Sequence, residues 1–202
     1  MREGLSKLNE NFNCLRSHQV CISEVCMKAS SLPIFVCGLI LTLGLFSCAS
    51  IPEGARAVTN FELNRYLGKW YEIARLDFKF EEGLDNTTAE YSLNKNGTVK
   101  VDNKGRRTET GEREQAIGKA KFAGDTDVGM LKVSFFGPFY SGYNVIMLDD
   151  YQHTLVAGAN LKYLWILSRT PSIPDEVKER YLAKAKELGY QIEDLVWVQH
   201  GE

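Results

Sequence analysis

The chain has 202 residues, of which 44% are hydrophobic and 25% charged, and this composition is typical of a soluble globular protein. Its formal net charge of -2 includes no long run of either sign, which argues against nucleic acid as a partner. All 5 cysteines precede Ala49, so the sequence predicts neither a disulfide framework nor a cysteine-based zinc site in the folded part.

The N-terminal quarter contains an export signal. The uncharged apolar run at residues 32–46 is shorter than the roughly 20 residues that a membrane-spanning helix needs. Its basic start and small flanking residues predict a secretory signal peptide over residues 27–47. The end of this run, "LFSC", resembles the lipobox of bacterial lipoproteins, which implies lipid attachment at Cys48. Ala49 after the cysteine implies the outer membrane, on its periplasmic side. The alternative is an ordinary signal peptide with a chance cysteine.

These signals divide the chain. Residues 1–26 precede Met27, the start of a signal peptide of normal length, and are interpreted as an upstream extension. Residues 48–60 are polar and carry Pro and Gly, which predicts a lipid-anchored tether. The folded domain is expected over residues 61–202.

Short runs rich in Val, Ile, Tyr, Phe and Thr, separated by turn residues, predict antiparallel strands after residue 67. They lie at residues 68–77, 87–93, 98–103, 113–122, 131–136, 143–148, 154–157 and 163–168. Asn96-Gly97 between two of them predicts a tight hairpin in which both residues adopt positive φ. Neighbouring strands in the sequence are therefore expected to pair in space.

One helix follows the strands. Ser172 is its expected N-cap and Gly189 its stop, while Val177, Tyr181 and Ala185 recur at helical spacing. A further strand-like run follows at residues 195–198. Because the run at residues 163–168 is apolar on both faces, the helix is expected to cover its outer face. Eight antiparallel strands without an open edge predict a barrel whose interior is either filled or holds one small ligand.

Two distant motifs identify the family. Gly68-Lys69-Trp70 resembles the G-x-W motif of lipocalins, and Arg169 resembles the arginine that ends their last barrel strand. The middle motif has the imperfect form "LDDY", and the stretches "GKWYEIAR", "KVSFFGPFYSGYNVI" and "YLWILSRTP" are close to the bacterial lipocalin subfamily. The resemblance implies an all-β, eight-stranded up-and-down barrel with one C-terminal α-helix packed outside. It also implies a floor closed by a short 3₁₀ turn, with Trp70 in the floor and Arg169 over its indole ring.

Inward-facing residues of this barrel are candidates for ligand binding. Trp165 and Tyr163 share the face expected to line the interior, and the resemblance places Phe135, Tyr140 and Tyr143 near the ligand. Glu72 has the parity of Trp70 and is expected to be a buried carboxylate unless a bulge turns it outward. For each residue, ordinary core or rim packing is the alternative.

Enzyme motifs are missing from the sequence. It contains neither G-x-S-x-G nor H-E-x-x-H, and residues 125–129 hold too few ligands for a calcium loop. We therefore expect no catalysis, no metal and no cofactor. The leading hypothesis is an outer-membrane lipoprotein that binds amphiphilic lipids such as lysophospholipids or fatty acids. The alternatives are a carrier of a sterol or haem-like cargo, an envelope interaction protein with a filled barrel, and, least supported, an enzyme. Association into a homodimer stays open.

Overall fold

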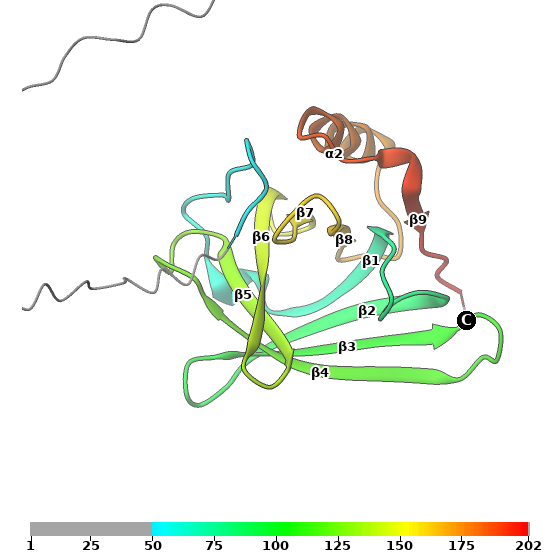
Figure 1. Ribbon diagram of the computed structural model, residues 1–202, viewed down its shortest axis with the longest axis horizontal. Helices are drawn as coiled ribbons and strands as arrows, with labels where there is room; N and C mark the ends of the chain where they lie inside the picture. The colour runs from blue at the N-terminus through cyan, green and yellow to red at the C-terminus, as the bar shows by residue number, and fades with distance from the viewer. Residues whose placement is uncertain (1–49, 202) are drawn as a thin grey trace, which may run out of the picture. The chain divides into compact units, whose positions relative to one another are not determined.

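The computed structural model describes residues 50–201, which form a closed antiparallel barrel (Figure 1). The sheet order is β2-β3-β4-β5-β6-β7-β8-β1-β9, and an additional β2–β1 pairing closes the ring of the first eight strands. Their bounds are β1 (Gly68–Leu76), β2 (Leu84–Leu93), β3 (Val99–Arg107), β4 (Arg113–Phe122), β5 (Met130–Phe136), β6 (Phe139–Asp149), β7 (His153–Ala157) and β8 (Leu164–Ser168). The remaining elements are α1 (Leu63–Tyr66), α2 (Asp175–Glu187), η1 (Ile192–Asp194) and β9 (Leu195–Trp197).

The predicted barrel is therefore confirmed, with differences at strand ends. β6 begins at Phe139, before the expected start at Tyr143, because Gly137 adopts φ 56° and lets Phe136 pair with Phe139 across a two-residue turn. In the β2–β3 hairpin, Gly97 has φ 79° but Asn96 does not adopt positive φ. Asn96 instead uses its side-chain oxygen, which accepts a hydrogen bond from the Thr98 backbone at 3.1 Å.

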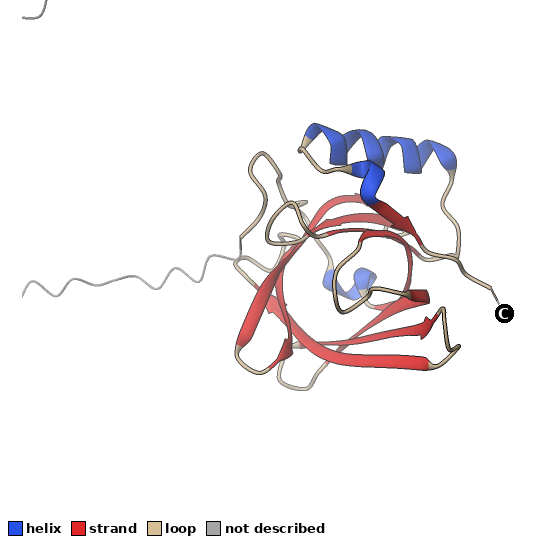
Figure 2. Ribbon diagram, turned by 45° about the vertical axis from the view of Figure 1, so that its right-hand side comes forward, coloured by secondary structure: helices blue, strands red, loops and turns tan. Residues whose placement is uncertain are grey.

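Helix α2 lies outside the barrel, as predicted (Figure 2). Tyr181 and Ala185 are fully buried in a cluster that includes Leu155, Leu164 and Ile166 of β7 and β8. Gly189, with φ 89°, ends the helix, but the expected N-cap was wrong: Pro174 occupies that position and makes no side-chain capping bond. Ser172 instead accepts hydrogen bonds at its carbonyl from Ser168 and Thr170.

Strands β4 and β5 pair over only a short stretch of the barrel wall. These strands pair only from Lys119↔Ser134 to Phe122↔Leu131, so residues 113–118 of β4 have no partner strand on this side within the described chain. Phe135 packs against Gly118, where an added Cβ would lie 2.8 Å from the phenyl ring. A glycine is thus required at this position for the ring to lie against the strand.

Residues 50–60, predicted as a tether, lie along the barrel. The Val58 backbone N–H donates to the Val145 carbonyl at 2.8 Å, and Phe61 donates to Asp127 at 2.7 Å. At the other end of the segment, the Asn144 side chain donates to the Ser50 carbonyl at 3.2 Å. This part of the predicted tether is therefore bound to the fold. The predicted signal peptide, Cys48 and the upstream extension lie outside the described residues. Between residues 50 and 201, no helix is both long and apolar enough to cross a bilayer.

Candidate functional site

One end of the barrel is closed by a floor built around Trp70. The indole is fully buried and donates from Nε1 to the Tyr66 carbonyl at 2.8 Å. The Arg169 guanidinium lies 3.9 Å from the centre of the indole ring. It also donates to main-chain carbonyls at the end of α1 and the start of β1, those of Arg65, Tyr66, Leu67 and Lys69. Arg169 therefore satisfies acceptors that the short helix leaves open. This helix is a single α-helical turn rather than the expected 3₁₀ turn.

The middle motif completes the floor. Asp150 and Tyr151 adopt φ 44° and 59° in the β6–β7 turn. The Tyr151 hydroxyl accepts a hydrogen bond from the Glu62 backbone at 2.7 Å, and its carbonyl accepts from Arg169 at 3.1 Å. The three motifs, distant in sequence, therefore meet at one end of the barrel.

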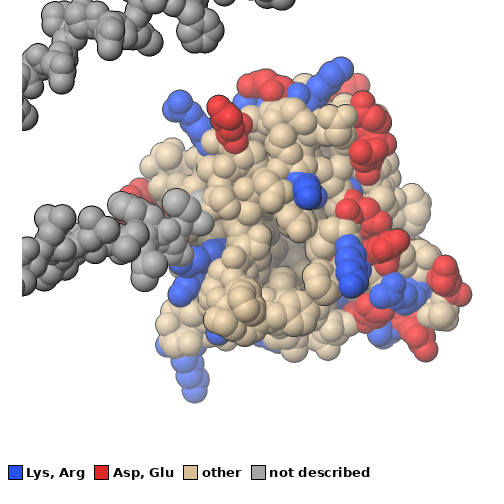
Figure 3. Space-filling model, in the orientation of Figure 1, with Lys and Arg blue, Asp and Glu red and all other residues tan. Residues whose placement is uncertain are grey.

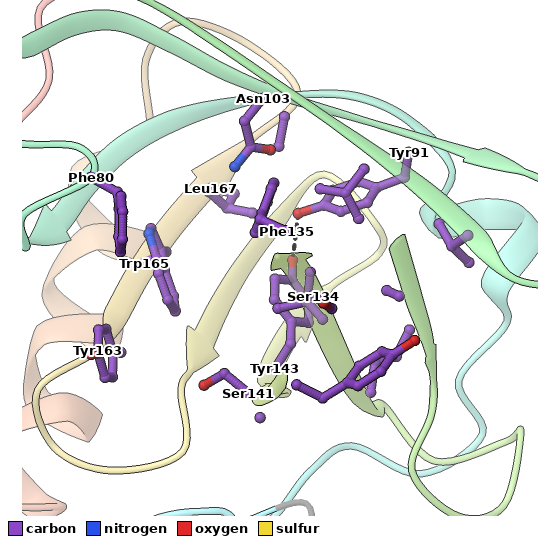
Figure 4. A pocket seen from close by; sticks show the side chains of 18 of the residues that line it. Phe80, Tyr91, Asn103, Ser134, Phe135, Ser141, Tyr143, Tyr163, Trp165 and Leu167 are labelled. Atoms are coloured by element: carbon purple, nitrogen blue, oxygen red, sulfur yellow. Dashed lines mark hydrogen bonds between the residues drawn. The ribbon is translucent and has the colours of Figure 1, made fainter. Parts of the chain in front are cut away.

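Above this floor lies a cavity of about 320 Å³. Its walls are mainly apolar and include Val99, Val101, Ala120, Leu131 and Val133. Figure 4 shows Tyr91 on one side of the cavity and Phe80, Tyr163 and Trp165 on the opposite side. The cavity therefore runs from the floor to an aromatic mouth.

Three tyrosines bring hydroxyl groups into the deep part of the cavity, but these groups bind one another. The Tyr143 hydroxyl lies 2.7 Å from that of Tyr66 and 2.9 Å from that of Tyr91. Burial raises the pKa of all three hydroxyls, so they stay neutral. Because the hydroxyls are paired and uncharged, the deep part of the cavity suits an apolar chain.

The mouth is formed by aromatic rings and a carboxyl group. Tyr163 and Trp165 both line the cavity as expected, with ring centres 6.2 Å apart and planes 14° from parallel. Phe78 lies edge-on to both rings. Glu81 accepts a hydrogen bond from Trp165 Nε1 at 3.1 Å. Burial, reinforced by the nearby Glu72 carboxylate, raises the pKa of Glu81 to about 8.

Glu72 faces inward and is buried, as its parity predicted. The bulge occurs after it, between Glu72 and Ala74, and so does not turn the carboxylate outward. Arg75, with a side chain 1% exposed, donates to Glu72 at 2.8 Å, and Thr87 donates at 3.1 Å. Burial raises the pKa of Glu72, against the opposing effect of the Arg75 guanidinium. Glu72, Arg75 and Thr87 thus form a buried hydrogen-bonded network in the barrel wall near the mouth.

The other predicted residues occupy different places. Phe135 and Tyr143 line the cavity, whereas the Tyr140 ring is surrounded by the amines of Lys119, Lys121 and Lys132 at 4.9 to 6.0 Å from its centre. Although Tyr140 lies at the edge of the cavity, its ring packs against these side chains of β4 and β5. Its contact with a ligand stays a prediction.

A second cavity of about 240 Å³ adjoins the first at the mouth. Both are lined by Glu72, Glu81, Asn103 and Phe135, but the second also contains Thr87, Thr88, Glu114 and Gln115. The buried Asn103 side-chain oxygen has no hydrogen-bond partner among the described residues. Polar side chains make up a larger share of the lining of the second cavity than of the first.

Sequence reasoning did not select Phe78, Glu81, Arg75 or Asn103 as site residues. The first two lie in the β1–β2 loop, where strand periodicity gives no direction for a side chain. Arg75 turns inward only because of the bulge. Asn103 could have been found from its parity with Val99 and Val101, two inward residues of the same strand.

Comparison with known proteins links this geometry to a family. Residues 61–200 match the model of the lipocalin-like domain. The chain is 53% identical over 149 residues to "Outer membrane lipoprotein Blc" of Citrobacter freundii, covering 73% of this chain and 84% of that protein. It is 38% identical over 149 residues to "Temperature-induced lipocalin-1" of Arabidopsis thaliana, covering 68% and 78%. Insecticyanin of the tobacco hornworm Manduca sexta has a similar fold, with a TM-score of 0.62, 21% identity and coverage of 76% and 88%.

Proposed function

Since this chain belongs to the lipocalin family and is a lipid-binding lipoprotein of the bacterial outer membrane rather than an enzyme, we propose that its ligand is a single-chain amphiphile. A lysophospholipid or a fatty acid would place its acyl chain in the cavity above Trp70. Its head group would stay at the mouth. The role is binding and transport without bond-making.

The observation that carries this proposal is a mainly apolar cavity that ends at an aromatic mouth. A volume of about 320 Å³ holds roughly ten methylene groups at about 30 Å³ each, close to the volume per molecule in liquid water. A second acyl chain would have to enter the neighbouring cavity, where Glu114, Gln115 and Thr88 would lose contact with water. The cavity therefore favours one acyl chain over two.

The mouth supports a polar head group at this position. The unpaired Asn103 oxygen can accept a hydrogen bond, and Glu81 can donate one when protonated or accept one when ionised. Burial of ten methylenes contributes about 8 kcal/mol at about 0.8 kcal/mol each. Ordering the chain and restricting its motion offset several kcal/mol of this. We therefore expect dissociation constants weaker than about 1 μM, the value that the full 8 kcal/mol would give.

The alternatives receive less support from the cavity. A haem-like cargo normally needs an axial ligand. Among the described residues, neither His153 nor His200 lines the cavity, and the tyrosine hydroxyls in its deep part are bonded to one another. An interaction protein with a filled barrel would leave no such volume. A sterol is bulky and rigid, and its binding is tested alongside the lipids below.

Lipid attachment at Cys48 is the second part of the proposal. Two or more acyl chains hold a protein stably on a membrane, where one chain gives only marginal binding. Cys48→Ser should therefore leave the protein in the soluble periplasmic fraction or stall its processing. A mutant that is processed and fractionates with the outer membrane like wild type would show that the anchor lies elsewhere.

Titration of the detergent-free protein tests the ligand. Tryptophan emission should change saturably with lysophospholipid and fatty acid, and much less with a diacyl phospholipid or a sterol. Trp165→Phe is the control, because its loss should remove the signal while Trp70 and Trp197 remain. Equal affinity for the diacyl lipid, or no saturable response to any compound, would contradict the proposal.

A further inference from the structure

The mouth of the barrel carries an exposed aromatic surface. The exposed fractions of Phe80, Phe136 and Phe139 are 63%, 63% and 79%. Phe80 and Phe136 have ring centres 5.4 Å apart, although they come from the β1–β2 loop and the β5–β6 hairpin. We call these three residues the mouth patch. Clustered apolar side chains beside a cavity indicate an interaction site, whereas scattered ones need no explanation.

Basic side chains border this patch. Tyr140 directly follows Phe139 in β6, and its ring is contacted by the amines of Lys119, Lys121 and Lys132. Figure 3 shows a hollow in the face of the molecule, surrounded mainly by uncharged residues with basic residues close beside it, and acidic residues along the right side and the top of that face. An apolar patch with an adjacent lysine cluster is complementary to a bilayer with anionic head groups.

The N-terminal segment shows where a membrane anchor would lie. Ser50 accepts a hydrogen bond from Asn144 and lies against Gly142, both in the half of β6 nearer the mouth. Gly142 is only three residues from Phe139, or about 10 Å along a strand. Cys48 lies only two residues before Ser50 in the sequence. The segment to residue 61 then continues toward the floor.

We propose that the mouth patch docks on the same bilayer that holds the lipid attached to Cys48, so that the barrel opens toward the membrane. This inference rests on the lipid attachment in the proposed function. Phe136 and Phe139 enter the interface, and the lysines contact anionic head groups. The floor with Arg169 faces away. A single-chain amphiphile then passes between bilayer and cavity without exposing its chain to water.

Quenching by brominated phospholipid tests the orientation. The full lipidated protein is placed in vesicles of phosphatidylethanolamine and phosphatidylglycerol as Phe139→Trp and, separately, as Leu93→Trp. Leu93 is 53% exposed at the opposite end of the barrel, so it is a matched control. The emission added by Phe139→Trp should be quenched at least twofold more than that added by Leu93→Trp. Equal quenching, greater quenching at residue 93, or none at either would overturn the proposal.

Transfer kinetics supply a second readout that does not depend on the inserted tryptophans. Phe136→Ser with Phe139→Ser should slow uptake of a fluorescent lysophospholipid from vesicles about tenfold. Because both residues also line the cavity, this slowing should exceed any loss of affinity for the monomeric ligand in solution. Leu93→Ser removes a 53% exposed apolar residue from the floor end of β2 and should leave uptake unchanged. Unchanged uptake in the double variant would overturn the docking. If the lipid attachment at Cys48 is wrong, fractionation of Cys48→Ser will show it. If the protein does not bind the lipid, the solution titration of the wild type will show it.

Discussion

The floor and the mouth of this barrel use similar residue types in opposite ways. At the floor, Trp70 is fully buried, its N–H is bonded, and Arg169 satisfies the surrounding carbonyls. At the mouth, Trp165 is bonded to a carboxyl group with a raised pKa, and the Asn103 oxygen is unpaired. A site in which every polar group is paired stabilises the fold, while one with unpaired groups is available to a ligand. The following variants test this contrast.

Trp70→Ala should have the largest effect on stability. Truncating a buried tryptophan costs about 3 to 5 kcal/mol, because transfer energy is lost and a cavity remains. Urea denaturation measures the loss in free energy of unfolding. Under conditions in which the variant is folded, its order of affinities for lysophospholipid, fatty acid and diacyl lipid should match that of the wild type. A changed order would show that the floor also selects the ligand.

Arg169→Ala should cost less, about 2 to 3 kcal/mol, since it removes the contact with the indole and several hydrogen bonds to carbonyls. In the double mutant with Trp70→Ala, the total loss should fall short of the sum by about 1 kcal/mol, because the two groups touch. A thermodynamic cycle from urea denaturation gives this coupling. Additive losses would contradict a stabilising stacking contact.

Glu81 should make stability depend on pH. Its pKa is raised from an ordinary value of 4.5 to about 8, so the folded state holds the proton more tightly than the unfolded state between these values. Stability is therefore greatest below about pH 4.5 for this group and falls as pH rises through about 8. Allowing for partial exposure, we expect about 1 to 2 kcal/mol of difference.

Glu81→Gln is the matched variant, because it keeps the shape and cannot ionise. It should flatten the fall in stability over this range, as well as the change in Trp165 emission that accompanies ionisation. Glu72, Asp77 and Arg75 are the charged neighbours of Glu81, and Glu72→Gln should shift the midpoint downward by removing a nearby negative charge. An unchanged pH profile in Glu81→Gln would assign the titration to another group.

Phe78→Ala should have the smallest effect on stability and a visible effect on binding. Its ring contacts Tyr163 and Trp165 at the mouth, and such aromatic pairs contribute about 0.5 to 1.5 kcal/mol. We expect a loss of about 1 kcal/mol in stability and a three- to tenfold weaker affinity for lysophospholipid. Calorimetry with monomeric ligand measures the affinity. A loss of stability as large as that expected for Trp70→Ala would mean that Phe78 belongs to the hydrophobic core.

The sequence by itself determined the barrel and its floor. Strand positions follow from runs rich in β-branched and aromatic residues between turn residues. Trp70 and Arg169 follow from motifs, because each depends mainly on its place at a strand end. The inward direction of Tyr163, Trp165 and Glu72 also follows from period-two alternation.

Tertiary structure decided the mouth and the path of the N-terminal segment. Phe78 and Glu81 lie in a loop whose side chains are directed by contacts with Trp165 and Tyr163 rather than by local periodicity. The bulge after Glu72 depends on pairing with β8, and only pairing turns Arg75 toward the carboxylate. Residues 50–60 have no strand pattern, yet Asn144, Val145 and Asp127 hold them on the barrel. Such positions depend on partners far along the chain, and local composition does not specify those partners.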